Sequence, residues 1–181
     1  MSSGFFILGD QLFAPNHFKK FTNHPVFMAE DYNLCTTHRH HQQKLVLFLS
    51  SMREFNANSK LKIEYNKLHN TPSKTAPYTK RLLDFIKKQK LKKIESFEVS
   101  DKTFCAELSK FFKKNDIEWI QHPSPAFACP SKTFVKHLKN NKAPTMKSFY
   151  ESERKRLKIL INKDGSPQGG RWSFDKENRK S

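Results

Sequence analysis

The sequence has few cysteines and none of the cysteine spacings that bind metals. Cys35, Cys105 and Cys129 lie far apart and form no Cys-x-x-Cys pair, so neither a disulfide framework nor a zinc knuckle is indicated. This usage is typical of a reducing compartment, and we expect a cytoplasmic protein. The run at residues 38–41 contains His38, His40 and His41, but no carboxylate or cysteine stands at ligand spacing. A structural or surface role is therefore the better interpretation of these histidines, and no metal site is expected.

Long apolar runs and the common nucleotide motifs are absent too. No apolar stretch approaches the ~20 residues that a membrane-spanning helix needs, and residues 1–10 lack the basic segment of a signal peptide. Neither Gly-x-Gly-x-x-Gly nor Gly-x-x-x-x-Gly-Lys-Ser/Thr occurs, which argues against the usual phosphate-binding loops for dinucleotides and nucleoside triphosphates. No nucleophile, acid and base stand at recognisable spacing, so we expect no catalytic residues in this chain. A stand-alone enzyme would have to rely on Asp10 and Glu30, with pKa values shifted by burial.

Negative charge is scarce. Against 34 Lys and Arg there are 17 Asp and Glu, which gives the 181 residues a formal net charge of +17. Such a surplus concentrates polyanions near the protein, so nucleic acid is a candidate partner and an anionic membrane surface a weaker one. A solvated lysine-rich surface without any partner accounts for the composition equally well.

Short apolar runs alternate with helical patterns over the first two thirds of the chain. Strands are expected at residues 5–8, 25–30, 61–65, 92–99 and 117–120. Helices are expected at residues 40–56, 77–90 and 101–112, where apolar residues recur every three or four positions. Because parallel strands need helical crossovers, this alternation predicts an α/β fold of the flavodoxin or Rossmann type. Its open, mainly parallel five-stranded sheet would carry helices on both faces.

The alternation of predicted strands and helices ends after Pro123 and Pro125. Two short helices are expected, at residues 131–140 and 145–161, with Ser131 and Thr145 as helix caps. We therefore expect an α/β domain over residues 1–125, a helical extension of that domain over 126–161, and the start of an interdomain linker over 162–181. The closing segment carries Trp172 and Phe174, aromatic residues that contribute only when a partner surface receives them. This predicts a domain severed from a larger protein.

Polar residues follow the first two predicted strands. In an open α/β sheet, ligands bind at the carboxyl ends of the strands, so Gly9, Asp10, Gln11 and Glu30 are expected at the mouth of a pocket. Gly9 would let the backbone approach a ligand, and Asp10 or Gln11 could hydrogen-bond a planar heterocycle or a ribityl chain. Taken alone, these residues are explained more simply if Asp10 caps a turn that Gly9 permits.

Several segments occur in an order found in one family. They are residues 6–12, 40–44, 48–55, 146–154 and 169–180, and the last, Gly-Gly-Arg-Trp-Ser-Phe-Asp-Lys-Glu-Asn-Arg-Lys, is the most specific. Over essentially its whole length the chain resembles the amino-terminal antenna domain of the iron–sulfur bacterial cryptochromes and photolyases, which include the prokaryotic six-four photolyases. The Gly-Asp-Gln-Leu run at residues 9–12 would be a weak signal alone.

The resemblance implies a role in light-dependent DNA repair or blue-light sensing. The family's carboxy-terminal photolyase domain holds flavin adenine dinucleotide and an iron–sulfur cluster, and that half would lie outside these residues. We therefore expect the chain alone to be inactive in repair, with DNA bound through the full-length protein.

The resemblance also implies an antenna chromophore, 6,7-dimethyl-8-ribityllumazine. By position its pocket would involve Gly9, Asp10, Leu34, Thr37 and Phe48. Leu34 and Thr37 stand where chromophore-binding members tend to carry Glu and Tyr, and Phe48 stands where an aliphatic residue is usual. These departures remove polar contacts and add bulk to the pocket. The alternative to an antenna domain is an autonomous basic flavodoxin-like module that binds nucleotides or nucleic acid.

Overall fold

The computed structural model describes residues 3–68, 76–141, 143 and 145–173. The chain divides into two compact units, Met1–Phe127 and Ala128–Ser181. We call these the first unit and the second unit. Whether the second unit is an extension of the first domain followed by a linker stays a prediction. No helix in the described ranges combines the length and the apolar character needed to cross a membrane.

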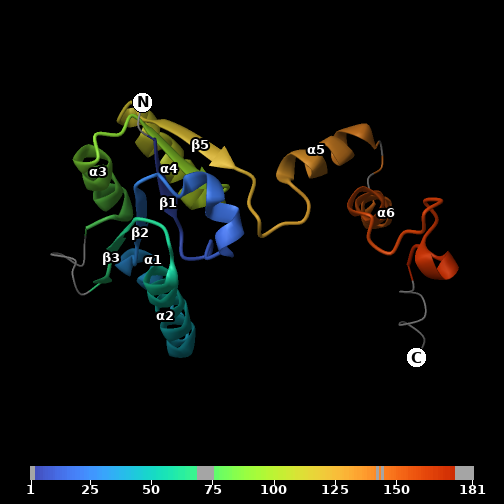
Figure 1. The fold of residues 1–181 in the computed structure, drawn as a ribbon, viewed down its shortest axis with the longest axis horizontal. Coiled ribbons are helices and arrows are strands. Elements are labelled where there is room, and N and C mark those ends of the chain that lie inside the picture. Colours follow the sequence, from blue (N-terminus) through green and yellow to red (C-terminus); the bar gives the residue numbers. More distant parts are fainter. Residues whose placement is uncertain (1–2, 69–75, 142, 144, 174–181) are drawn as a thin grey trace. The chain divides into compact units, whose positions relative to one another are not determined.

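The first unit contains one five-stranded sheet (Figure 1). Its strands are β1 (Ser3–Ile7), β2 (Val26–Ala29), β3 (Ile63–Asn66), β4 (Lys93–Phe97) and β5 (Glu118–His122). Their order is β3-β2-β1-β4-β5, and every neighbouring pair is parallel. This confirms the predicted parallel α/β sheet. The chain reverses its direction of travel across the sheet between β1 and β4, which places a crevice at the carboxyl ends of these strands.

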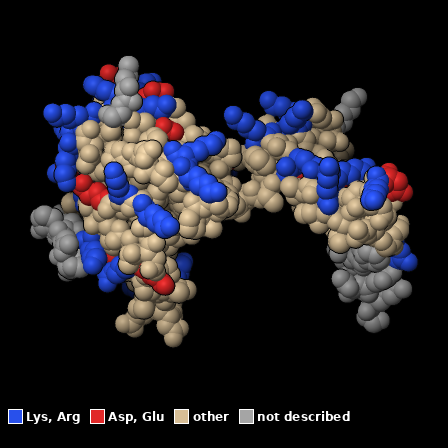
Figure 2. Space-filling model, viewed as in Figure 1, with Lys and Arg blue, Asp and Glu red and all other residues tan. Residues whose placement is uncertain are grey.

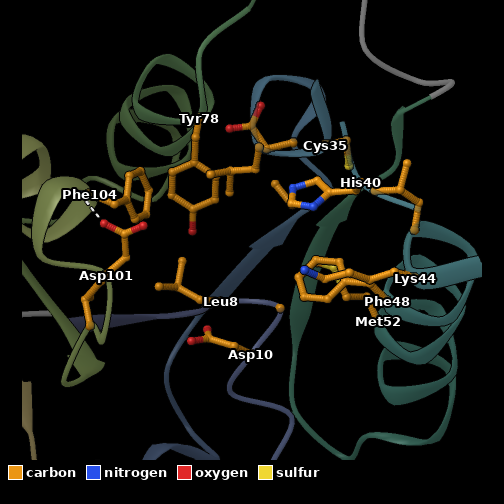
Figure 3. A pocket seen from close by; sticks show the side chains of 16 residues that line it. Leu8, Asp10, Cys35, His40, Lys44, Phe48, Met52, Tyr78, Asp101 and Phe104 are labelled. Carbon is orange, nitrogen blue, oxygen red and sulfur yellow. Dashed lines mark hydrogen bonds between the residues drawn. The ribbon is translucent and has the colours of Figure 1, made fainter. Parts of the chain in front are cut away.

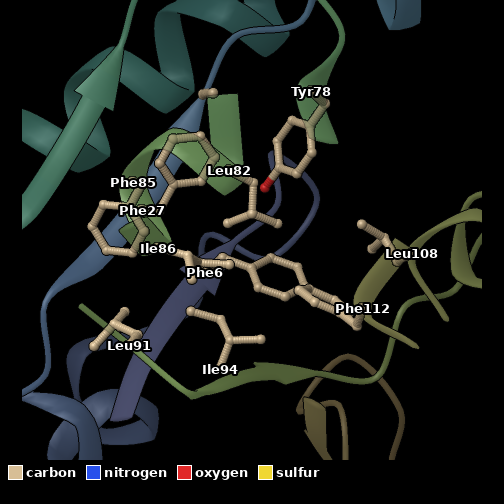
Figure 4. Packing of buried hydrophobic residues seen from close by; sticks show 11 residues of the cluster. Phe6, Phe27, Tyr78, Leu82, Phe85, Ile86, Leu91, Ile94, Leu108 and Phe112 are labelled. Atoms are coloured by element: carbon tan, nitrogen blue, oxygen red, sulfur yellow. The ribbon is translucent and has the colours of Figure 1, made fainter. Parts of the chain in front are cut away.

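Side chains of β1 are buried on both faces of the sheet. Phe6 lies in a cluster beneath α3 (Tyr78–Lys88) and α4 (Lys102–Lys114), together with Phe27, Leu82, Ile94 and Phe112 (Figure 4). Phe5 and Ile7 point to the opposite face, where Phe18, Met28, Met52 and Phe97 form a second cluster beneath η1 (Pro15–Phe21) and α2 (Gln42–Asn58). Alternation along a strand explains this division, since successive side chains point to opposite faces.

Caps fix the starts of the helices that follow the strands. The Asp101 carboxylate accepts a hydrogen bond from the Phe104 N–H at 2.9 Å and begins α4, as predicted. At α2 the cap is His41, whose Nδ1 accepts from the Gln43 N–H at 3.2 Å. This gives one residue of the histidine run a structural role. Two short elements, η1 and α1 (Tyr32–Thr36), were not predicted.

The second unit contains α5 (Ser131–Asn140), α6 (Met146–Leu157) and η3 (Gln168–Gly170). Thr145 caps α6 through a capping box with Ser148, as predicted. The prediction that Ser131 caps α5 was wrong, because this helix begins after Pro130 and has no side-chain cap. Helix α6 is shorter than the predicted 145–161, since Lys158 takes a left-handed conformation with φ of 55° and ends it.

Arg154 organises the end of the second unit. Its buried guanidinium donates hydrogen bonds to the carbonyls of Ile159, Leu160 and Trp172 at 3.3, 2.6 and 2.8 Å. It also lies 5.4 Å from the centre of the Trp172 ring, and Lys155 Nζ lies 4.8 Å from the same centre. The Trp172 ring is therefore contacted within its own unit. Phe174 lies outside the described residues.

Candidate functional site

A cavity of about 240 Å³ opens at the carboxyl ends of the central strands. Its base is formed by Leu8, Gly9 and Asp10 after β1, with Ala29 at the end of β2 and Val99 after β4. Figure 3 shows the side chains of the helical walls facing each other across this base. The cavity thus lies beside the reversal point of the sheet, where topology predicts a ligand.

One wall is aromatic and contains an unpaired buried hydroxyl. Tyr78, the first residue of α3, and Phe104 of α4 pack edge to face with ring centres 5.5 Å apart. Tyr78 is only 3% exposed, and its hydroxyl has no hydrogen-bond partner among the described residues. Burial raises the pKa of Tyr78 well above its usual value, so the group is a neutral donor. In Figure 3 this hydroxyl points toward Leu8 at the base of the cavity.

The facing wall comes from α2 and the segment before it. His40, Lys44, Phe48 and Met52 line this side. The Phe48 ring rests against Gly9, since a Cβ atom on Gly9 would stand 2.3 Å from Phe48 Cζ and 2.9 Å from Met52 Sδ. The missing side chain at Gly9 therefore makes room for Phe48, where we had expected it to admit a ligand.

Carboxylates surround the base of the cavity. Asp31 is buried and caps α1 by accepting a hydrogen bond from the Asn33 N–H at 3.1 Å, and it lies 3.4 Å from an Arg81 nitrogen. Burial raises the pKa of Asp31 despite these contacts. Burial of its inner side likewise raises the pKa of Asp10, which reaches solvent at the rim. Lys44 lines the same cavity, which therefore offers charges of both signs to a polar ligand, and His40 adds an imidazole.

The family model described as deoxyribodipyrimidine photo-lyase-related protein matches residues 5–181. The chain belongs to this family. The match begins within β1 and covers the other four strands and the whole second unit of this photolyase-related protein. No curated protein sequence matches the chain.

Four of the five predicted pocket residues of this photolyase-related protein come together. Gly9, Asp10, Leu34 and Phe48 all line the cavity. Thr37 does not line it, because this residue closes α1 and its hydroxyl donates to the Asn33 carbonyl at 2.7 Å. Binding of a chromophore by these residues stays a prediction.

Two residues expected at the mouth have other roles. Gln11 is buried, its Nε2 donates to the Glu98 carbonyl at 3.1 Å and its Oε1 accepts from the Leu8 N–H at 3.4 Å. It therefore fixes the loop after β1. Glu30 is fully buried and bonded to Arg53, Tyr65 and the Leu68 N–H, away from the cavity lining.

Sequence reasoning missed Tyr78, Asp101 and His40 as lining residues. Tyr78 and Asp101 stand at the starts of α3 and α4, and helices that follow parallel strands begin at the carboxyl edge. That signal was available in the sequence. His40 belongs to the histidine run, and within the described residues no group of three metal-ligating side chains comes together there or elsewhere.

Proposed function

We propose that this photolyase-related chain is a light-collecting domain of a DNA-repair or blue-light-sensing flavoprotein. The observation that carries the proposal is the buried, unpaired Tyr78 hydroxyl in an aromatic cavity at the reversal point of the sheet. An unsatisfied buried hydroxyl costs roughly 1–3 kcal/mol, and a ligand acceptor atom removes that cost. The flavin and the iron–sulfur cluster would reside in a carboxy-terminal photolyase domain that acts as the partner of this chain.

The lining residues fit a lumazine as antenna. Phe48, Tyr78 and Phe104 offer ring faces and edges to a planar bicycle, and the Tyr78 hydroxyl would donate to a ring heteroatom. Asp10 and Lys44 line the open side, where a ribityl chain would leave the cavity for solvent. When bound, a lumazine absorbs near-ultraviolet and blue light and passes the excitation to the flavin. The protein groups hold it in one orientation and exclude water from its ring.

Titration with 6,7-dimethyl-8-ribityllumazine tests this proposal. The purified chain should quench the ligand fluorescence and carry its near-ultraviolet band through gel filtration. Tyr78→Phe removes the donor and should weaken binding about 2- to 10-fold, as expected for one hydrogen bond. Tyr150→Phe in the second unit is the matched control and should have no effect. A protein that leaves the column without the band after saturation would contradict the proposal.

A second candidate function is nucleic-acid binding by the opposite edge of the sheet. Helices that cross over between parallel strands end at the amino edge, and the last turns of η1, α3 and α4 are basic, whereas that of α2 is not. The lysines in question are Lys19, Lys20, Lys87, Lys88, Lys113 and Lys114. Figure 2 shows Lys and Arg side chains spread over the visible face of the first unit. In the described part of the chain no large exposed apolar residue belongs to these helix ends, which favours a phosphate backbone over a membrane surface.

Binding to double-stranded DNA at increasing salt tests this candidate. Lys87→Glu/Lys113→Glu should lower affinity and reduce the slope of log K against log salt by about 2, roughly one unit per lost phosphate contact. Lys80→Glu/Lys102→Glu changes the charge equally at other positions of the first unit and should have a smaller effect. Equal losses in both variants would show that net charge alone is responsible.

A further inference from the structure

A second hollow adjoins the cavity. It has a volume of about 480 Å³ and is open to solvent. Its lining residues are Gly9, Asp10, Leu12, Phe13, Lys44, Leu47, Phe48 and Ser51. Four of them, Gly9, Asp10, Lys44 and Phe48, also line the cavity. The two spaces are therefore neighbours that share one wall.

Phe48 is the aromatic part of that shared wall. Its ring reaches the backbone of Gly9 so closely that Cζ and Cε1 would stand 2.3 and 2.7 Å from a Cβ atom there. The side chain is 37% exposed, so one side of the ring meets protein while the other reaches solvent. Gly9 has no side chain and Lys44 is flexible, so the ring is the rigid barrier between the cavity and the hollow.

We propose that Phe48 is a specificity-determining residue that limits the length of the ligand in the cavity. This inference rests on the proposed function. With the ring in place, the cavity of about 240 Å³ accepts a planar bicycle, and a tail attached to it must remain in solvent. That volume lies below the ~300 Å³ at which sites for larger ligands begin.

Without the ring, the two spaces join across Gly9. The hollow then adds the Ser51 hydroxyl to Asp10 and Lys44, which line both spaces, next to the apolar side chains Leu12 and Leu47. This combination fits a flexible polyol chain, since each hydroxyl can pair with a charged or hydroxyl group while the carbons lie on apolar surface. In the natural chain only the ring system of the ligand therefore contributes to affinity. In a variant with a smaller residue at position 48, the tail contributes as well.

Two ligands and two proteins test the inference. The first ligand is 6,7-dimethyl-8-ribityllumazine, and the second is 6,7,8-trimethyllumazine, which has the same ring with a methyl group in place of the tail. Dissociation constants are measured by fluorescence for the natural chain and for Phe48→Leu. In the natural chain the two constants should agree within about 3-fold. In Phe48→Leu the ribityl compound should bind about 10-fold more tightly than the trimethyl compound, as one or two new hydrogen bonds give.

Leu47→Ala is the matched control. Leu47 lines the hollow but not the cavity, so this variant alters the hollow and leaves the barrier intact. The two dissociation constants should still agree within about 3-fold. If Phe48→Leu does not fold, Phe48→Met keeps most of the volume in a flexible side chain and gives the same comparison.

The possible failures are distinguishable. If the trimethyl compound binds and Phe48→Leu leaves the ratio of the two constants unchanged, the role of Phe48 is refuted while the proposed ligand site stands. A natural chain that already binds the ribityl compound 10-fold more tightly refutes it as well. If neither compound binds either protein, the proposed function fails and this inference fails with it.

Discussion

Arg53 of α2 and Glu30, which follows β2, form a bidentate ion pair. Arg53 Nε lies 2.6 Å from Glu30 Oε1, and Nη2 lies 2.9 Å from Oε2. Tyr65 of β3 donates to the same carboxylate, and so does the Leu68 N–H at 3.0 Å. Arg81 of α3 donates to the Glu30 carbonyl at 2.8 Å. One buried residue thus connects two strands with helices on both faces of the sheet.

Acid should unfold the protein through Glu30. Burial alone would raise the pKa of its carboxyl, but hydrogen bonds from Arg53, Tyr65 and Leu68 lower it from 4.5 to about 2. A group whose pKa is lowered by folding stabilises the protein above its unfolded pKa, and this contribution is lost as the pH falls toward the folded value. We expect a loss on the order of 3 kcal/mol between pH 5 and 2, measured by urea unfolding.

Glu30→Gln is the comparison for that measurement. The variant should lose about 1–3 kcal/mol at pH 7, because a buried carboxylate that accepts hydrogen bonds from Arg53, Tyr65 and the Leu68 N–H is replaced by an amide with one acceptor oxygen. Its stability should then fall less steeply than that of the natural chain below pH 5. Parallel stability curves for the two proteins would show that other carboxyls control acid unfolding.

Gly9→Ala should destabilise the first unit by about 1–3 kcal/mol, because the new methyl group overlaps Phe48 and Met52. The cost should shrink by about 1 kcal/mol or more in a Phe48→Leu background, where the overlapping ring is gone. Thermal or urea unfolding of the four proteins measures this coupling. If Gly9→Ala lowers the stability equally in both backgrounds, overlap with Phe48 is not the reason that position 9 requires glycine.

Asp101→Ala should remove the cap of α4 and cost about 0.5–2 kcal/mol. For a protein of this size that corresponds to a fall in Tm of roughly 2–4 °C per kcal/mol. Asp101→Asn keeps an oxygen that accepts from the Phe104 N–H, so it should retain most of the stability. A large loss in the Asn variant would indicate that the negative charge matters more than the hydrogen bond.

Arg154→Lys should loosen the end of the second unit. A single ammonium cannot reach three carbonyls and also lie over the Tyr150 and Trp172 rings, as the planar guanidinium does. We expect faster proteolysis between residues 158 and 172, and a change of Trp172 fluorescence in a Trp119→Phe background. Arg156→Lys is the control, because this side chain is exposed and pairs mainly with Glu153 three residues away. Equal proteolysis of the two variants would contradict the role of Arg154.

The strands could be predicted because each is an uninterrupted or alternating apolar run between turn residues. Phe5 to Ile7, for example, can be buried on both faces only inside a parallel sheet with helices above and below. The short elements η1 and α1 could not be predicted, since five to seven residues contain too few turns to show a helical period.

The location of the site could be predicted from the sequence, but only some of its side-chain contacts could. Topology placed Gly9 and Asp10 at the carboxyl edge, but the contact of Phe48 with Gly9 depends on the rotation of α2. Nor does the sequence show that Glu30 pairs with Arg53, or that the Tyr78 hydroxyl is buried without a partner. Such properties arise from packing between segments that are distant along the chain.

The central position of β1 also affects how the chain is made. One edge of β1 pairs with β2, but its other edge pairs with β4, with Gly4 opposite Ile94. At roughly 5–20 residues per second, a ribosome needs roughly 5–20 s to synthesise the residues between these partners. During that time Phe5 and Phe6 lack half of their eventual surroundings. The nascent chain is therefore most prone to aggregation before β4 emerges, and chaperones that bind apolar segments should act in this interval.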